Sequence, residues 1–135
     1  MARMLLVERA GRAAAAASAI RDRGHAVSVV EAEPLLPADV FAELPRVTVL
    51  CWLMGAGDDL HPEVNGEQLE TVLMKVVDTG VRAIVFERSD GQPNSHIEHA
   101  RDTWHIPIVE IDADASGSDG WATSVADAVD GLLGL

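Results

Sequence analysis

Carboxylates at the ends of the apolar runs are the residues of this chain best placed to do chemistry. They are Glu8, Glu31, Glu87, Glu110 and Asp112. Acids that gather at one edge of a sheet can hold a cation or shift the pKa values of their neighbours. No catalytic triad accompanies them in the sequence. An enzyme of unknown type that uses these strand-end carboxylates is therefore kept only as a second alternative.

Two histidines form the other chemically active pair. His96 and His99 are three residues apart, so they share one face of a helix, as metal ligands can. A third ligand would have to be Asp90 or Glu87. Because the usual spacing of a metal motif is absent, we expect no metal site.

The elements that position these residues follow from an alternation of apolar and amphipathic segments. The predicted strands are Met4–Val7, Ala26–Glu31, Val47–Met54, Val81–Phe86 and His105–Ile111. The predicted helices are Gly11–Arg23, Pro37–Leu44, Gly66–Thr79, Ser95–Trp104 and Trp121–Leu133. Such alternation is typical of βαβ units. It predicts a single α/β domain over residues 1–135, a Rossmann-like three-layer domain with a five-stranded parallel sheet and helices on both faces.

Two strands can be placed within that sheet. The third run is apolar throughout, which predicts the central strand. Pro107 lacks a backbone donor, so the fifth strand is expected at an edge, or begins near this residue. Ligands of such sheets bind in the crevice at the carboxyl ends of the strands. Polar loops follow several of these ends, so we expect the functional site there.

Composition limits the classes of partner. The 135 residues include 22 acidic and 10 basic side chains, for a net charge of −12. This excess argues against binding to nucleic acid or to an anionic membrane surface. The chain has one cysteine, Cys51, so it can form no intrachain disulfide. With no apolar run long enough to span a membrane, we expect a cytoplasmic protein.

The middle of the chain resembles a known enzyme family. The segment "VTVLCWLMGAG…NGEQLETVLMKVVDTGVRAIVFE" is similar to the extended and atypical short-chain dehydrogenase/reductases, which include nucleotide-sugar epimerases and NmrA-like proteins. The positions that carry the resemblance are Asn65, Gly66, Leu69, Leu73, Gly80, Val81 and Arg82. The resemblance implies that the chain is a truncated, degenerate member of this family, whose Rossmann folds bind NAD or NADP.

The first turn departs from that family. A dinucleotide fingerprint needs glycines at the strand-to-helix turn. The register Glu8-x-x-Gly11-x-x-Ala14 keeps only the middle glycine, and Glu8 puts a carboxylate where the phosphates would lie. We therefore expect no cofactor, with NAD or NADP as the alternative.

The residues that would contact such a ligand can still be named. Arg9 and Arg12 would bind phosphate through their side chains, and Glu31 would accept hydrogen bonds from a ribose. The resemblance adds the small-residue loop after the third strand. The candidate cofactor-binding residues are Arg9, Gly11, Arg12, Glu31, Leu53, Met54 and Gly55.

Catalysis of the family's kind is not expected. The family uses a Tyr-x-x-x-Lys pair, whereas this chain has no tyrosine and its only lysine is Lys75. We predict a non-catalytic scaffold, sensor or partner-binding domain that binds a protein partner or forms a homodimer. The apolar face of the terminal helix is one candidate dimer surface. The alternative is a nucleotide or dinucleotide binding module that uses the strand-end crevice.

Overall fold

The computed structural model describes residues 3–8, 11, 13–31, 39–53, 68–88, 95–112 and 119–134. The strands are β1 (Arg3–Glu8), β2 (Ala26–Glu31), β3 (Val49–Leu53), β4 (Ala83–Arg88) and β5 (Ile108–Asp112). The helices are α1 (Ala14–Asp22), α2 (Asp39–Glu43), α3 (Leu69–Val77), α4 (Ser95–Trp104) and α5 (Asp119–Leu133), and a 3₁₀ turn, η1 (Leu44–Arg46), follows α2. Each strand and helix predicted from the sequence is present in the predicted order.

The five strands form one parallel sheet in the order β2-β1-β3-β4-β5. The prediction that the third strand is central is confirmed, and all five of its residues are buried. β5 lies at an edge and begins directly after Pro107. The carbonyl oxygen of Pro107 accepts a hydrogen bond of 3.0 Å from the backbone N–H of Ile84, so this proline still contributes to the ladder.

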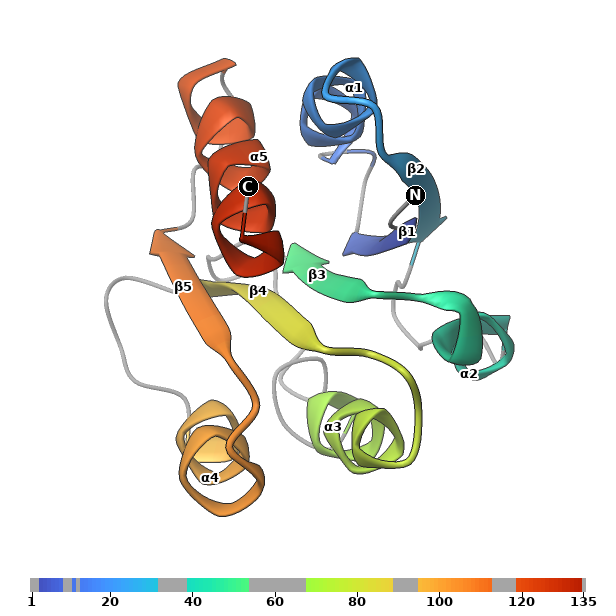
Figure 1. Cartoon of the computed structure of the whole chain (residues 1–135), viewed down its shortest axis with the longest axis vertical. Coiled ribbons are helices and arrows are strands. Elements are labelled where there is room, and N and C mark those ends of the chain that lie inside the picture. Colours follow the sequence, from blue (N-terminus) through green and yellow to red (C-terminus); the bar gives the residue numbers. More distant parts are fainter. Residues whose placement is uncertain are drawn as a thin grey trace.

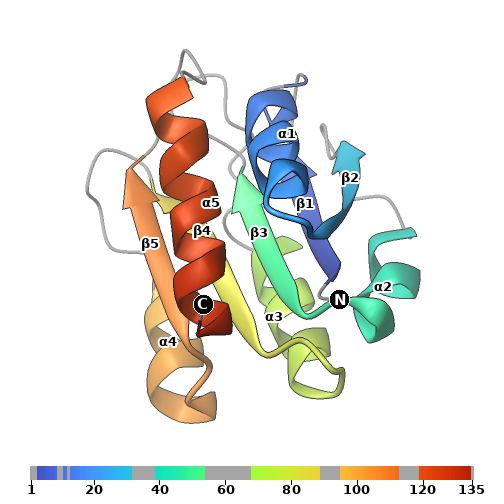
Figure 2. The same cartoon turned by 45° about the horizontal axis from the view of Figure 1, so that its top comes forward.

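Helices cover both faces of the sheet, which gives the predicted three layers (Figures 1 and 2). α1 and α5 lie on one face, and α2, α3 and α4 lie on the other. Successive residues of a strand point to opposite faces. Leu5 and Val7 therefore join the core under α2, α3 and α4, whereas Met4 and Leu6 join the core under α1 and α5. Because both faces of the inner strands β1, β3 and β4 are buried, these strands contain continuous apolar runs.

An ionic network joins α5 to the turn between α1 and β2. Arg23 Nη1 lies 2.6 Å from Asp130 Oδ2 and 2.8 Å from Asp127 Oδ1, and His25 Nε2 lies 2.9 Å from Asp130 Oδ1. The hydrogen bonds with His25 and Arg23 lower the pKa of Asp130 from its ordinary value. The network fixes the turn against α5 at residues more than a hundred positions apart.

We expect Asp130→Asn to lower the free energy of unfolding by about 0.5–1 kcal/mol at neutral pH. The folded-state pKa of Asp130 is depressed, so its contribution is present at neutral pH and disappears as the pH falls through that pKa. Urea unfolding at neutral pH and at a pH below 3.8, the ordinary pKa of aspartate, measures both effects. Asp22→Asn, which removes the same charge from an exposed position of α1, is the control. An equal loss in both variants would contradict the role of the network.

Two details of the predicted packing need correction. The helical spacing of the apolar residues in Gly66–Thr79 predicts one apolar face that includes Val76 and Val77. Val77 is nevertheless 46% exposed, because it lies one position past the buried Val76. The apolar face of the terminal helix, proposed as a dimer surface, is covered within the chain itself. Val125 and Val129 are fully buried in the core that α5 shares with α1.

Among the described residues, no helix combines the length and apolar character needed to cross a bilayer. This observation agrees with the absence of a long apolar run in the sequence.

Candidate functional site at the carboxyl edge of the sheet

The strand order creates a switch point between β1 and β3. These strands are neighbours, yet the chain leaves β1 for α1 on one face and leaves β3 for α3 on the other (Figure 2). The connections therefore diverge at the carboxyl ends of these two strands. In open α/β sheets this divergence makes the crevice in which ligands bind. The predicted location of the site is thus the one that the topology favours.

The side chain of Glu8 lies at the N-terminus of α1, beside this switch point. It is the last residue of β1, and only 6% of it is exposed. Its Oε2 accepts a hydrogen bond of 3.3 Å from the backbone N–H of Ala13, the N-cap residue of α1. The free N–H groups and the dipole of a helix N-terminus favour a negative charge. In this chain the carboxylate of Glu8 supplies that charge.

The strand-end carboxylates do not form one cluster. Glu8 is opposite Glu31 in the β1–β2 register, and alternation places both on the α1/α5 side. Glu87 is fully buried on the same side, but the whole of β3 separates its strand from β1. Glu110 faces the other side, where its Oε2 lies 3.5 Å from Arg101 Nη2. A single acidic site built from all of these residues is therefore excluded.

The predicted cofactor-binding residues are placed unequally. Gly11 is exposed, and its φ of +71° is one that glycine adopts without strain. Glu31 is exposed at the end of β2. Leu53 is fully buried in the α1/α5 core, so its side chain is directed into the protein. Arg9, Arg12, Met54 and Gly55 lie outside the described residues.

The two histidines share a face of α4, as their spacing predicts. Both line a pocket between α3 and α4, and His96 Nδ1 lies 3.8 Å from Glu70 Oε2. Of the third ligands considered, Glu87 lies on the opposite face of the sheet, and Asp90 is outside the described residues. In the part of the chain that the structure describes, no three acidic, histidine or cysteine side chains are grouped to hold a metal ion.

Comparison with known proteins gives a fold but no sequence family. No family model matches the chain, and no curated protein is similar to it in sequence. Among solved structures, the flavodoxin-like domain of a Synechococcus protein is similar, with a TM-score of 0.58 and 11% identity over 96% of this chain and 94% of that one. A short-chain flavodoxin associated with a non-canonical PDU bacterial microcompartment has a TM-score of 0.57 and 17% identity over 98% and 96% of the two chains. A flavodoxin of Streptococcus pneumonia TIGR4 has a TM-score of 0.52 and 16% identity over 98% and 97%.

The fold is flavodoxin-like. The strand order agrees, since 2-1-3-4-5 is the flavodoxin order, whereas dinucleotide-binding Rossmann folds have the order 3-2-1-4-5-6. The resemblance to short-chain dehydrogenases is therefore wrong, and the expectation of NAD or NADP loses the support it drew from that resemblance. Both folds begin with βαβ units of similar local sequence. They differ in where the third strand pairs, which a local motif does not encode.

Reasoning from the sequence missed the pocket between α3 and α4 in this flavodoxin-like domain. The pocket has a volume of about 450 Å³ and is lined by Glu70, Leu73, Met74, Ser95, His96, His99 and Trp104. The available signal was the composition of α3, in which six of nine residues are apolar, more than one buried face needs. Met74 is 57% exposed as a result.

Proposed function

We propose that this chain is a flavodoxin-like binding domain that acts as a sensor, scaffold or partner-binding protein and does not hold a flavin phosphate at the start of α1. The observation that carries the proposal is the hydrogen bond from the N–H of Ala13 to the carboxylate of Glu8. FMN in flavodoxin lies at the β1/β3 switch point. A bound phosphate there would meet a buried carboxylate of the same sign.

The residue types around this edge support the same conclusion. A planar ring binds well where aromatic side chains stack on it. The segments that follow β3 and β4, residues 54–67 and 89–94, contain no phenylalanine, tyrosine or tryptophan. Of the tryptophans, Trp52 is fully buried in β3. The segments after β3 and β4 therefore supply no such side chain for stacking, and the carboxylate of Glu8 already accepts from the N-cap N–H of α1.

The alternative is a flavin-binding or nucleotide-binding module. Two observations favour it: several of the similar structures are flavodoxins, and the exposed Gly11 in the β1–α1 turn has a positive φ. It requires that the charge of Glu8 be moved or neutralised when the ligand binds. The two candidates therefore make opposite predictions for a flavin titration.

We expect that adding the purified protein leaves the fluorescence of FMN and of riboflavin unchanged. Glu8→Gln removes the charge that would repel a phosphate and supplies an amide NH2 group that can donate to it, so this variant should bind FMN more tightly than riboflavin. Titration of flavin fluorescence measures both proteins. Glu31→Gln, the same charge change at the opposing position of β2, is the matched control and should behave as the wild type. Saturable binding of FMN to the wild-type protein would overturn the proposal in favour of the flavin module.

The proposal also limits the surface through which a protein partner could bind. A second copy of the chain or another protein would have to bind away from the face of α5 that packs against α1, because the chain itself covers that face. Sedimentation velocity of the 14.4 kDa chain separates a homodimer from a monomer that needs a different partner.

A further inference from the structure

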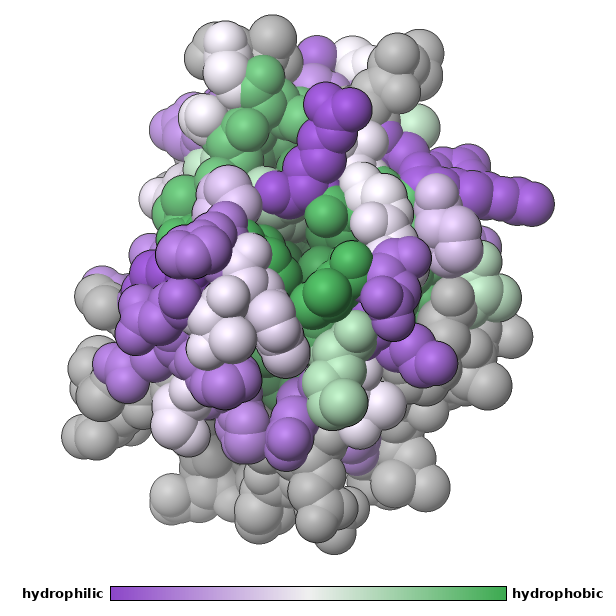
Figure 3. Space-filling model, turned by 60° about the horizontal axis from the view of Figure 1, so that its bottom comes forward, coloured by the Kyte–Doolittle hydropathy of each residue, from purple (hydrophilic) through white to green (hydrophobic). Residues whose placement is uncertain are grey.

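The groove between α3 and α4 combines apolar side chains with a few polar ones. Figure 3 shows hydrophobic side chains in a hollow bordered by hydrophilic residues on the face that carries these helices. Its volume of about 450 Å³ is within the range of small-molecule sites, roughly 300–1,000 Å³. Such sites are mostly apolar with a few polar groups that fix the ligand.

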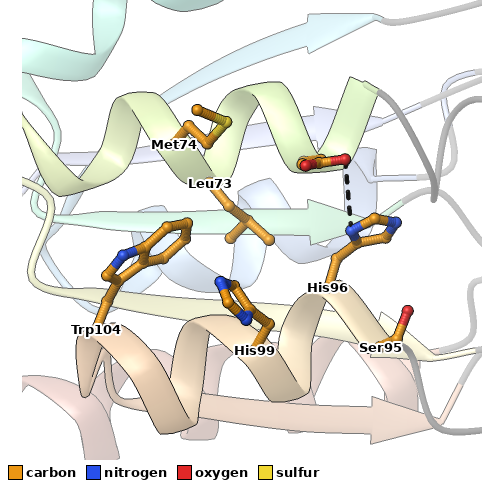
Figure 4. A pocket seen from close by; sticks show the side chains of 7 residues that line it. Leu73, Met74, Ser95, His96, His99 and Trp104 are labelled. Carbon is orange, nitrogen blue, oxygen red and sulfur yellow. Dashed lines mark ion pairs between the residues drawn. The ribbon is translucent and has the colours of Figure 1, made fainter.

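One end of the groove is aromatic and ordered. The rings of His99 and Trp104 meet edge to face, with their centroids 5.3 Å apart. Thr103 Oγ1 lies 3.3 Å from His99 Nδ1, a contact that holds the imidazole in place. Figure 4 shows Leu73 in the gap between the two helices and Met74 above it on α3. A flat apolar body would therefore contact Trp104, Leu73 and Met74 together.

The other end carries Glu70, the one acidic side chain among the described residues that line the groove. The carboxylate of Glu70 is 56% exposed and lies 3.8 Å from His96 Nδ1, as the dashed line in Figure 4 marks. A contact of this length leaves the exposed carboxylate able to accept from a ligand. The net charge of −12 adds a long-range attraction for cations.

We propose that the α3–α4 groove binds a small organic cation with a flat aromatic body, whose amino group lies against Glu70 and whose ring lies against Trp104. This site lies on the helices of one face and does not use Glu8, so it is independent of the flavin question.

Tryptamine, indole-3-propionate and 3-methylindole test the proposal because they share one ring and differ in charge. Amide chemical-shift changes on titration give each dissociation constant and the location of binding. Tryptamine should bind with a dissociation constant on the order of 1 mM or tighter, with shifts at Leu73, Met74 and His99. Indole-3-propionate should bind about tenfold more weakly.

Glu70→Gln and Trp104→Ala separate the contribution of charge to binding from the contribution of shape, and a third variant is the control. Glu70→Gln should weaken tryptamine about tenfold and leave 3-methylindole unchanged. Glu98→Gln removes the same charge from an exposed position of α4 that does not line the groove, and it should change neither ligand. Trp104→Ala should abolish binding of all three. Equal binding of tryptamine and indole-3-propionate, shifts away from α3 and α4, or no binding of tryptamine would each overturn the proposal.

Discussion

Replacing Trp52 with alanine is expected to lower the free energy of unfolding by about 3–5 kcal/mol. Trp52 is the largest of the fully buried side chains and lies in the central strand. In the sheet it is flanked by Val7 of β1 and Phe86 of β4, so its removal leaves a cavity lined by residues that cannot easily collapse. Urea unfolding followed by circular dichroism measures the change.

Trp104→Ala is the matched control for this prediction. It removes the same side chain from a partly exposed position at the edge of the groove and should cost much less. If Trp52→Ala does not fold at all, Trp52→Phe, which keeps most of the buried ring, provides a measurable loss. Equal losses for Trp52→Ala and Trp104→Ala would contradict the structure of the core.

The thiol of Cys51 is expected to be inert in the folded protein and reactive only after unfolding. Burial raises the pKa of the Cys51 thiol from 9.0 to about 12. Because the thiolate is the reactive form, this change alone lowers its fraction at neutral pH about a thousandfold. Complete burial in β3 also excludes the reagent.

Labelling with iodoacetamide, with and without urea, checks this prediction by mass spectrometry. The native protein should stay unlabelled over hours, while the unfolded protein should react at the rate of an ordinary cysteine. In Trp52→Ala the labelling should be faster, in proportion to its larger unfolded population. Immediate labelling of the native wild type would place Cys51 at an accessible site. The expected result instead excludes Cys51 as a redox centre.

Local features of this fold could be predicted from the sequence, whereas its long-range pairing could not. The continuous apolar run of β3 identified the central strand, and Pro107 identified the edge strand, because burial and a missing donor act at the residue itself. The pairing of β3 with β1 depends on contacts more than forty positions apart. The local motifs were therefore compatible with a dehydrogenase as well as with the fold that was found.

The candidate sites likewise contain some features that the local sequence predicts and others that depend on tertiary structure. Glu8 was identified at the first turn because its sign conflicts with a phosphate, and that argument needs only the local sequence. The distance between Glu8 and Glu87, in contrast, depends on the strand order. The groove was missed because Met74 and Trp104 come from two helices separated by β4. Only tertiary structure brings these side chains together.

The packing of α1 against α5 has a consequence for synthesis of the protein. Met4, Leu6 and Ile20 are buried in a core that also needs Trp121, Val125 and Val129. A nascent chain emerges from its N-terminus, so these early residues stay without their partners in α5 until that helix has left the ribosome. The core between α1 and α5 therefore assembles only after more than a hundred residues have been synthesised, and until then the alanine-rich segment and the first strand are surfaces for chaperones.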